Sequence, residues 1–514
     1  MLSKNEVTRL NLADKRQIVR ALLQSTFRSP RSFPLSYAQE QLWFMDKLQP
    51  GSPVYNIPLY MPFQGSFDLA SLKKALAALI QRHDMLRVHF ETGDEGPVQI
   101  VEPEVALDLH IEDLSTLPAD QRGAAMGQWL NAEVQKPFDL AAGVCVRYTL
   151  IRLDSFNHVL CATMHHIVTD AWSLGVFVSE MNTVYGAYRS GQQASPLPPL
   201  PPLQVEYSDY ARWQRANLRG LRLSKLVNYW TAQLAGAPSI LQLPTDYPRP
   251  KDQTFNGTLD GFVFDDDLSA ELIALCRQHK ITLFMLLLAC YYTLLYRYTG
   301  QQDLVVGAPV ANRGRPELEP IIGMFVNTLI LRVKLQDGQT FADLLKEVQA
   351  MSLAAFEHQT LPFEKLIDEL NVERVPGYPP LYQAVFNFQN ASLIESANPR
   401  AEGETMESGD FPFVHSNTAK VDLNLTVTQN ESKISGGFEY NTDLFDSATI
   451  AAMIDHFKMI ARKIVADPSI SLMDIPLGLD LSETGPDCND DDNAGRRDQT
   501  RSIEDGEFNF ELSD

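Results

Sequence analysis

Two adjacent histidines are the residues of this sequence that are best suited to proton transfer. They stand in the stretch MHHIVTDAWS, residues 164–173. A neutral imidazole is the one side chain whose ordinary pKa makes it a ready proton acceptor near neutral pH. Asp170, four residues after His166, can fix the turn or pair with a cation. Taken alone, HHxxxD fits a buried structural histidine pair about as well as it fits a general base.

The residues on either side predict how the histidines are positioned. The apolar run 158–164 is typical of a buried strand, and residues 174–188 carry apolar side chains at helical spacing. The histidines therefore stand between the end of a strand and the start of a helix. At such a junction a short polar side chain can point into a cleft while the core holds its backbone.

Composition excludes several classes of function. The chain has 514 residues, 45% of them hydrophobic, and a formal net charge of −22, which disfavours nonspecific binding to nucleic acid or to an anionic membrane. The five cysteines are scattered, without metal-ligand spacing, so a reducing compartment and no metal site are expected. No signal-peptide core or 18-residue apolar run is present, which predicts a cytoplasmic protein.

Six further motifs follow in order along the chain. They are SYAQEQLW (36–43), RHDMLRVHF (82–90), YSDYARWQ (207–214), IGMFVNTL (322–329), HQTLPFE (358–364) and YQAVFNFQN (382–390). Together with HHxxxD, they resemble the condensation domains of nonribosomal peptide synthetases over roughly residues 12–475. A free-standing condensation enzyme is expected, since no adenylation, carrier or thioesterase region accompanies the motifs.

The resemblance implies an α/β fold of two chloramphenicol-acetyltransferase-like lobes, arranged as a V-shaped pseudo-dimer with a central channel. The expected divisions are an N-terminal helix and connector (1–33), the first lobe (34–194), a Pro-rich linker (195–204), the second lobe (205–480) and an acidic tail (481–514). Periodicity predicts helices over 13–24, 68–81, 119–135, 220–234, 267–278, 281–298 and 447–465. It predicts strands over 54–63, 98–101, 107–111, 144–153, 159–164, 303–310, 328–335, 422–429 and 433–440.

The resemblance also assigns roles to individual residues. His166, the second histidine of HHxxxD, is the expected catalytic base or positioning residue. Asp170 is expected to pair with Arg313, at the end of a strand in the other lobe. The remaining residues expected to support the active site are His165, Arg82, Arg87, Trp172 and Asn327, the two arginines through buried ion pairs.

The implied reaction joins an acyl or peptidyl thioester on a carrier protein to an amine or a hydroxyl, giving an amide or an ester and releasing the chain where the acceptor is free. The carrier supplies the phosphopantetheine arm, no cofactor is bound permanently, and the acceptor is a small molecule or a second carrier-bound group. A monomer is expected, without nucleic-acid or membrane partners. The alternative is a catalytically inactive scaffold that recruits carriers or tailoring enzymes; the intact HHxxxD favours the enzyme.

The last 34 residues differ in composition from the rest. Residues 481–514 hold eleven acidic residues and three arginines, a net charge of 3 − 11 = −8. Most of this tail has almost no apolar content and is expected to be disordered. From Phe508 the sequence alternates apolar and polar residues, and Phe508, Phe510 and Leu512 fit a docking motif that adds a strand to a partner's sheet. A merely solubilising tail fits the composition equally well.

Overall fold

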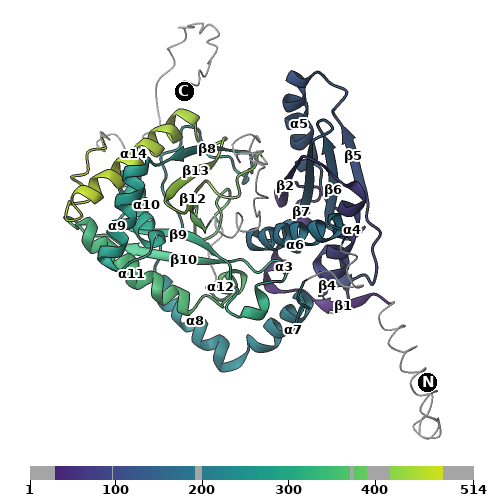
Figure 1. Cartoon of the computed structure of the whole chain (residues 1–514). Coiled ribbons are helices and arrows are strands. Elements are labelled where there is room, and N and C mark those ends of the chain that lie inside the picture. Colours follow the sequence, from purple (N-terminus) through teal and green to yellow (C-terminus); the bar gives the residue numbers. More distant parts are fainter. Residues whose placement is uncertain (1–28, 95, 192–199, 371–374, 391–416, 478–514) are drawn as a thin grey trace, which may run out of the picture. The chain divides into compact units, whose positions relative to one another are not determined.

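A computed structural model describes residues 29–94, 96–191, 200–370, 375–390 and 417–477 (Figure 1). The helix predicted over 13–24, most of the Pro-rich linker, Cys488 and the docking motif around Phe508 lie outside these residues. The fold is the expected α/β fold of two lobes, which the two halves of the chain build. The described residues form one compact unit.

The N-terminal lobe is built on two small sheets. One has the strand order β1-β4-β3 and the other the order β2-β7-β6-β5. Its strands are β1 (Arg31–Pro34), β2 (Asn56–Gln64), β3 (Val88–Gly93), β4 (Gly96–Val101), β5 (Leu109–Asp113), β6 (Val146–Arg152) and β7 (Asn157–His165). Its helices are α3 (Tyr37–Leu48), α4 (Leu69–Arg82), α5 (Ala119–Val134) and α6 (Ala171–Arg189), with short 3₁₀ turns η1 (Asp84–Arg87) and η2 (His166–Val168).

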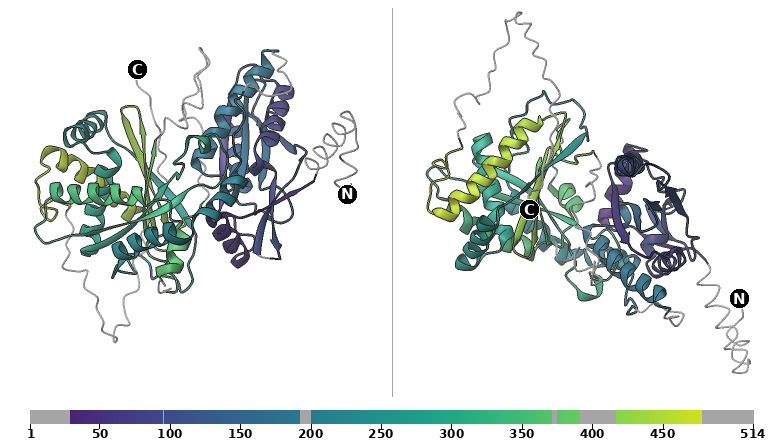
Figure 2. Two further views of the ribbon diagram at one scale, coloured as in Figure 1. Left: turned by 90° about the horizontal axis from the view of Figure 1, so that it is seen from below. Right: turned by 45° about the horizontal axis from the view of Figure 1, so that its top comes forward.

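The C-terminal lobe is built on one six-stranded sheet of order β10-β9-β11-β12-β13-β8. Its strands are β8 (Gly257–Val263), β9 (Asp303–Val310), β10 (Asn327–Lys334), β11 (Ala384–Asn390), β12 (Leu423–Asn430) and β13 (Lys433–Asn441). Its helices are α7 (Tyr207–Asn217), α8 (Gly220–Leu234), α9 (Asp266–His279), α10 (Leu283–Thr299), α11 (Phe341–Glu357), α12 (Phe363–Leu370) and α14 (Ser447–Ala466), with the 3₁₀ turn η3 (Pro316–Leu318). Helices α9, α10, α11 and α14 gather on one side of this sheet, as two further views also show (Figures 1 and 2).

Most predicted elements are present within one to three residues of their expected ends. Ser36 caps α3 with a reciprocal capping box to Gln39, because its side chain accepts from the Gln39 N–H while the Gln39 side chain accepts from the Ser36 N–H. Strands β6 and β7 form the predicted antiparallel hairpin. Strands β1, β8 and β11 were not predicted. β1 and β8 are sheet-edge strands of mostly polar or glycine-rich sequence, which gives them little apolar alternation.

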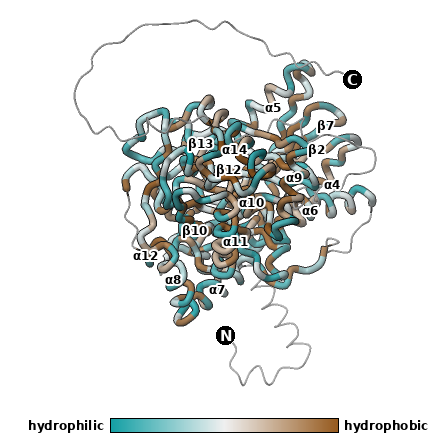
Figure 3. Tube along the Cα trace, turned by 90° about the vertical axis from the view of Figure 1, so that its left-hand side faces the viewer, coloured by the Kyte–Doolittle hydropathy of each residue, from teal (hydrophilic) through white to brown (hydrophobic). Residues whose placement is uncertain are grey.

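The apolar cores follow the lobes, with one exception. The largest core fills the C-terminal lobe around α10, whose residues are almost all buried; Figure 3 colours these elements by hydropathy. The core of the N-terminal lobe, however, includes residues from the second half of the chain. These are Tyr207, Tyr210, Leu318, Ile321, Ile322, Met324 and Phe325. The lobe that carries the histidines is therefore completed by residues that come after the linker.

Two observations bear on the expected surroundings of the chain. The four cysteines of the described residues are free and buried, as expected for small core side chains. Across the same residues, no single helix is long and apolar enough to cross a membrane. α9 and α10 pass that test of length and composition only as a pair, and the pair is bent by 107°.

Tyr207 and Gly323 fit closely where the second half of the chain enters the N-terminal lobe. Tyr207 is fully buried, and its hydroxyl donates to the Met324 carbonyl oxygen at 2.6 Å and bonds the Ser36 hydroxyl at 2.8 Å. A methyl group at Gly323 would overlap the Tyr207 ring. The glycine of IGMFVNTL is thus required by the first tyrosine of YSDYARWQ.

We predict that Gly323→Ala destabilises the fold by about 1–3 kcal/mol, because overpacking forces the Tyr207 ring or the loop to move. The midpoint of urea unfolding measures this loss. Gly186→Ala is the matched control, since an added methyl there meets nothing within 4 Å inside helix α6. Alanine also favours a helix over glycine, so the control should be neutral or slightly stabilising. Equal unfolding midpoints for the two variants would contradict the predicted fit.

Candidate active site

Strand β7 delivers both histidines to the end of the four-stranded sheet. It lies between β2 and β6, and the residues His158 to His165 are all buried. The apolar sequence of the strand matches this position, since a central strand is covered on both faces. At its end His165 still pairs with Asn56 of β2, and the chain then turns through η2. The sheet thus fixes the backbone of the histidine pair.

His165 is a structural member of the pair. The residue is only 3% exposed, and its ring lies near those of Tyr55 and Phe138, both 6.1 Å away between centroids. The Ile167 N–H donates to His165 Nδ1 at 3.2 Å, which assigns the proton to Nε2. Burial lowers the pKa of His165 to about 3, with smaller contributions from His166 and the Lys420 ammonium. His165 is therefore held neutral.

His166 differs from His165 in exposure and in tautomer. It is half-buried, and its backbone N–H donates to the Tyr55 carbonyl oxygen at 2.8 Å. Its Nδ1 lies 2.7 Å from the Thr169 carbonyl oxygen, so Nδ1–H donates and Nε2 keeps a free lone pair. Burial and then the Lys420 ammonium lower the pKa of His166 to about 4. The side chain is thus an oriented, uncharged imidazole with an available acceptor.

Asp170 forms the predicted ion pair with Arg313. Asp170 Oδ1 lies 3.1 Å from Arg313 Nη2, and both side chains are nearly inaccessible, at 4% and 1% exposed. Asp170 also caps α6 by accepting from the Ser173 N–H at 2.8 Å. Its second oxygen accepts from the Phe325 N–H at 3.0 Å. One carboxylate therefore holds the start of α6, a loop after β9 and the segment before β10.

Ser173 and Arg313 extend this contact. Arg313 Nη1 donates to the carbonyl oxygens of Leu318 at 2.6 Å and Ile321 at 2.7 Å. The Ser173 hydroxyl accepts from Arg313 Nη2 at 2.8 Å and from the Gly323 N–H at 3.1 Å. Sequence reasoning included Ser173 in its central stretch but gave it no role. Its position three residues after a capping aspartate is the signal that could have found it.

Trp172 and Asn327 make contacts of a different kind. Trp172 Nε1 donates to the Glu319 carbonyl oxygen at 2.9 Å. Asn327 Nδ2 donates to the carbonyl oxygens of Gln359 and Leu361, each at 2.8 Å, and its Oδ1 accepts from the Phe363 N–H at 3.0 Å. Asn327 therefore joins the start of β10 to the HQTLPFE segment.

Arg82 and Arg87 are both buried in ion pairs, as predicted. Arg82 Nε bonds Glu180 of α6 at 3.0 Å, and Glu180 also bonds His83. Arg87 Nη2 bonds Asp84 at 2.6 Å, and Asp84 in turn accepts from Arg31 and from Ser208. In the described part of the chain, neither arginine contacts His166 or Asp170. Their contribution to the active-site wall therefore stays a prediction.

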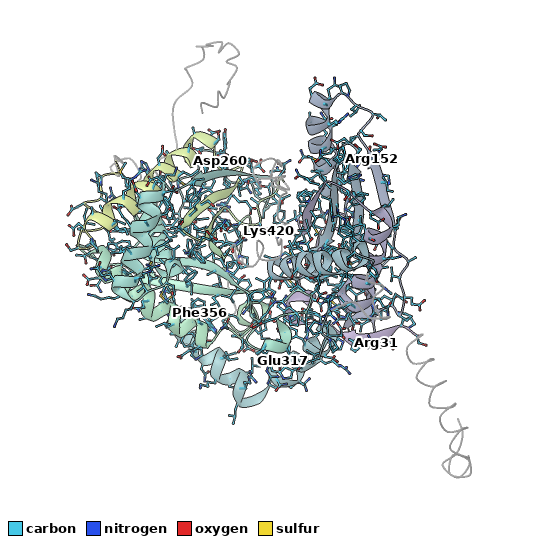
Figure 4. All side chains as sticks on the ribbon, viewed as in Figure 1. Arg31, Arg152, Asp260, Glu317, Phe356 and Lys420 are labelled. Carbon is cyan, nitrogen blue, oxygen red and sulfur yellow. The ribbon has the colours of Figure 1, made fainter. Side chains whose placement is uncertain are left out.

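Sequence reasoning missed two residues near the histidines, Tyr55 and Lys420. Tyr55 precedes β2, and Lys420 precedes β12 in the other lobe (Figure 4). The Lys420 ammonium lies 5.2 Å from the centroid of the Tyr55 ring. No motif signals this contact, because it joins residues 365 positions apart. Among the described side chains no group of three or more His, Cys, Asp or Glu is placed to hold a metal ion.

The comparisons with known proteins agree with this geometry. The family model named "Condensation domain" matches residues 30–482, and thus covers all seven motifs together with the sheet, helix and ion pair described above. The chain belongs to the condensation domain family. Condensation domains are acyltransferases of nonribosomal peptide synthetases that form amide bonds between substrates held by carrier proteins. The present chain is an enzyme of this type.

Two curated relatives show the range of similarity. This condensation domain is 42% identical over 446 residues to a linear gramicidin synthase of Brevibacillus parabrevis, covering 86% of this chain and 8% of the synthase polypeptide. It is 37% identical over 447 residues to the phosphinothricin tripeptide synthetase PhsC of Streptomyces viridochromogenes, covering 86% of this chain and 40% of the synthetase. The chain thus spans less than half the length of either relative.

Solved structures share the fold. A four-domain nonribosomal peptide synthetase bound to AMP and glycine has a TM-score of 0.76 at 22% identity, covering 90% of this chain and 34% of that protein. The X-domain from teicoplanin biosynthesis, in complex with OxyB, has a TM-score of 0.74 at 25% identity, covering 88% and 97%. SgcC5 of Streptomyces globisporus has a TM-score of 0.68 at 24% identity, covering 85% and 100%.

We predict that Asp170→Asn lowers the free energy of unfolding by about 3–5 kcal/mol, because the buried Arg313 guanidinium loses its counter-charge. Asp265→Asn is the matched control. Asp265 also caps a helix and pairs with an arginine at 3.0 Å, but both side chains of that pair are more than half exposed. Urea unfolding should show a much smaller loss for the control. A control loss as large as that of Asp170→Asn would refute the proposed role of burial.

The neutral histidine pair predicts a pH dependence of stability. Because the folded-state pKa of His165 and His166 lies below the ordinary value near 6.5, the unfolded chain takes up protons first as the pH falls. Stability should therefore be complete above pH 6.5 and decrease below it, by at most about 1.4 kcal/mol per pH unit for each histidine. Urea unfolding of wild type and His165→Gln between pH 5 and 7.5 should show a shallower slope for the variant. His110→Gln, which removes an exposed histidine, should keep the slope of wild type.

Proposed function

We propose that this chain condenses a carrier-bound acyl or peptidyl thioester with an amine or hydroxyl nucleophile, and that His166 accepts the proton of the nucleophile. The observation that supports this most strongly is the tautomer of His166. Its Nδ1–H is committed to the Thr169 carbonyl oxygen, which leaves the Nε2 lone pair for a substrate. Where the acceptor is a free small molecule, the product leaves the carrier.

The proposed step uses only this imidazole and the two substrates. The nucleophile's lone pair attacks the thioester carbonyl carbon, and His166 Nε2 takes the proton that the nucleophile loses. The C–N or C–O bond forms and the C–S bond breaks. The proton then passes from His166 to the departing pantetheine thiolate, which regenerates the neutral base. A positioned base of this kind typically contributes about 10²–10⁴-fold to the rate.

His165, Asp170 and Arg313 support this step indirectly. His165 holds the turn through the Ile167 N–H, and Asp170 with Arg313 fixes the start of α6 directly after Thr169. Together they set the position of the carbonyl oxygen that selects the His166 tautomer. Alignment of two bound reactants can itself lower the barrier substantially.

A scaffold without catalysis is the second candidate. It is favoured by the likeness to the teicoplanin X-domain, which was solved in complex with OxyB. The intact pair His165 and His166, with a free acceptor on the second, favours the enzyme instead. A carrier loaded with an acyl group, mixed with this chain and with candidate amines and alcohols, separates the two. Intact-mass measurement should show loss of the acyl mass from the carrier and appearance of an amide or an ester.

We predict that His166→Ala lowers single-turnover transfer at least tenfold and about 10²–10⁴-fold if proton transfer dominates. The unfolding midpoint should stay close to that of wild type, because His166 is only half-buried. His110→Ala, at an exposed histidine in the same lobe, should transfer at the rate of wild type. Near-normal transfer by a folded His166→Ala variant would remove proton transfer at this residue from the mechanism.

A further inference from the structure

Lys420 brings a positive charge from the C-terminal lobe to the histidines of the N-terminal lobe. It lies in the short segment before β12, two residues before Asp422, and its main-chain carbonyl oxygen accepts from Gln253 Nε2 at 3.2 Å. This segment is therefore tied to the C-terminal lobe. The side chain reaches across to Tyr55, where the ammonium lies 5.2 Å from the ring centroid.

Tyr55 links Lys420 to both histidines. Its carbonyl oxygen accepts from the His166 N–H at 2.8 Å, and its ring lies 6.1 Å from the His165 ring. The ammonium is close enough that its charge acts on both imidazoles. A cation near a neutral imidazole opposes a second positive charge there.

We propose that Lys420 is a positioning residue for the condensation reaction, and that its ammonium keeps His166 uncharged so that Nε2 can accept a proton. The inference rests on the function proposed above. It adds a contribution of the C-terminal lobe that no motif names. It also makes the basicity of the histidine depend on contact between the lobes.

Other charged groups around the histidines define what Lys420 must overcome. Asp170, at the start of α6, raises the pKa of His166, while the Lys420 ammonium lowers it. Arg313 already neutralises Asp170 through their ion pair. Glu439 of β13 is the carboxylate that acts on Lys420 itself. Of these groups, Lys420 is the cation whose charge acts directly on both His165 and His166.

The pH profile of transfer tests the proposal. Single-turnover transfer from a loaded carrier is measured for the full chain between pH 4.5 and 8. In Lys420→Met the acidic limb should move to higher pH by about one unit, because the charge that opposes protonation of the imidazole is removed. At a fixed pH below that limb, the variant should therefore transfer up to about tenfold more slowly than wild type. Lys420→Arg keeps the charge and should keep the limb of wild type.

Lys458→Met is the matched control. Lys458 is also in the C-terminal lobe, and its ammonium lies 5.8 Å from the Phe262 ring, so this variant removes one lysine and one cation–π contact away from the histidines. Its acidic limb should coincide with that of wild type. A loss of rate in Lys420→Met with an unshifted limb would mean a merely structural role and would overturn the proposal.

A second measurement keeps the inference separate from the proposed function. NMR titration of the His166 imidazole in wild type and in Lys420→Met, or in Lys420→Gln should the first variant not fold, needs no turnover. A higher pKa without the ammonium supports the proposal, and an equal pKa overturns it. If wild type transfers no acyl group, the proposed function fails while this titration still decides the role of Lys420. Because Lys420 is solvent-accessible, added salt should reduce the difference.

Discussion

The buried contact of Asp170 with Arg313 is the interaction on which the active site depends. Two opposite charges lie 3.1 Å apart in a place that water hardly reaches. Desolvation disfavours both, and burial does lower the pKa of Arg313. The cost is offset by hydrogen bonds from Ser173 and Phe325 to the carboxylate and from Arg313 to two carbonyl oxygens. The pair therefore specifies one arrangement of the segments that meet beside the histidines.

The histidines themselves show how backbone position becomes chemistry. Both come from one strand end, yet one accepts a hydrogen bond at Nδ1 and the other donates from Nδ1. The difference follows from the 3₁₀ turn, which brings the Thr169 carbonyl oxygen to His166 and the Ile167 N–H to His165. A one-residue shift of the turn would exchange or remove these partners. Neighbouring residues of the same type thus receive opposite tasks.

Sequence reasoning predicted the strand, the helix, the capping residue Ser36 and the pairing of Asp170 with Arg313. These follow from local periodicity or from motifs that state their own partners. It did not find Tyr55 or Lys420, because a contact between residues far apart in the chain leaves no periodic trace. Nor did it assign Tyr207 to the N-terminal lobe's core, since apolar spacing shows that a residue is buried but not where. Edge strands β1 and β8 were missed for want of apolar alternation.

The entry of residues 207–210 and 318–325 into the N-terminal core has a consequence for how such proteins can be recombined. A cut at the Pro-rich linker divides the sequence neatly, but it does not divide the folded structure. A hybrid that joins the first half of this chain to the second half of a relative would bring together a Ser36 and a Tyr207–Gly323 fit of separate origin. Compatible exchange requires that both sides of this fit, and of the Asp170–Arg313 pair, be inherited together. Whole lobes are therefore poorer units of exchange than the complete domain.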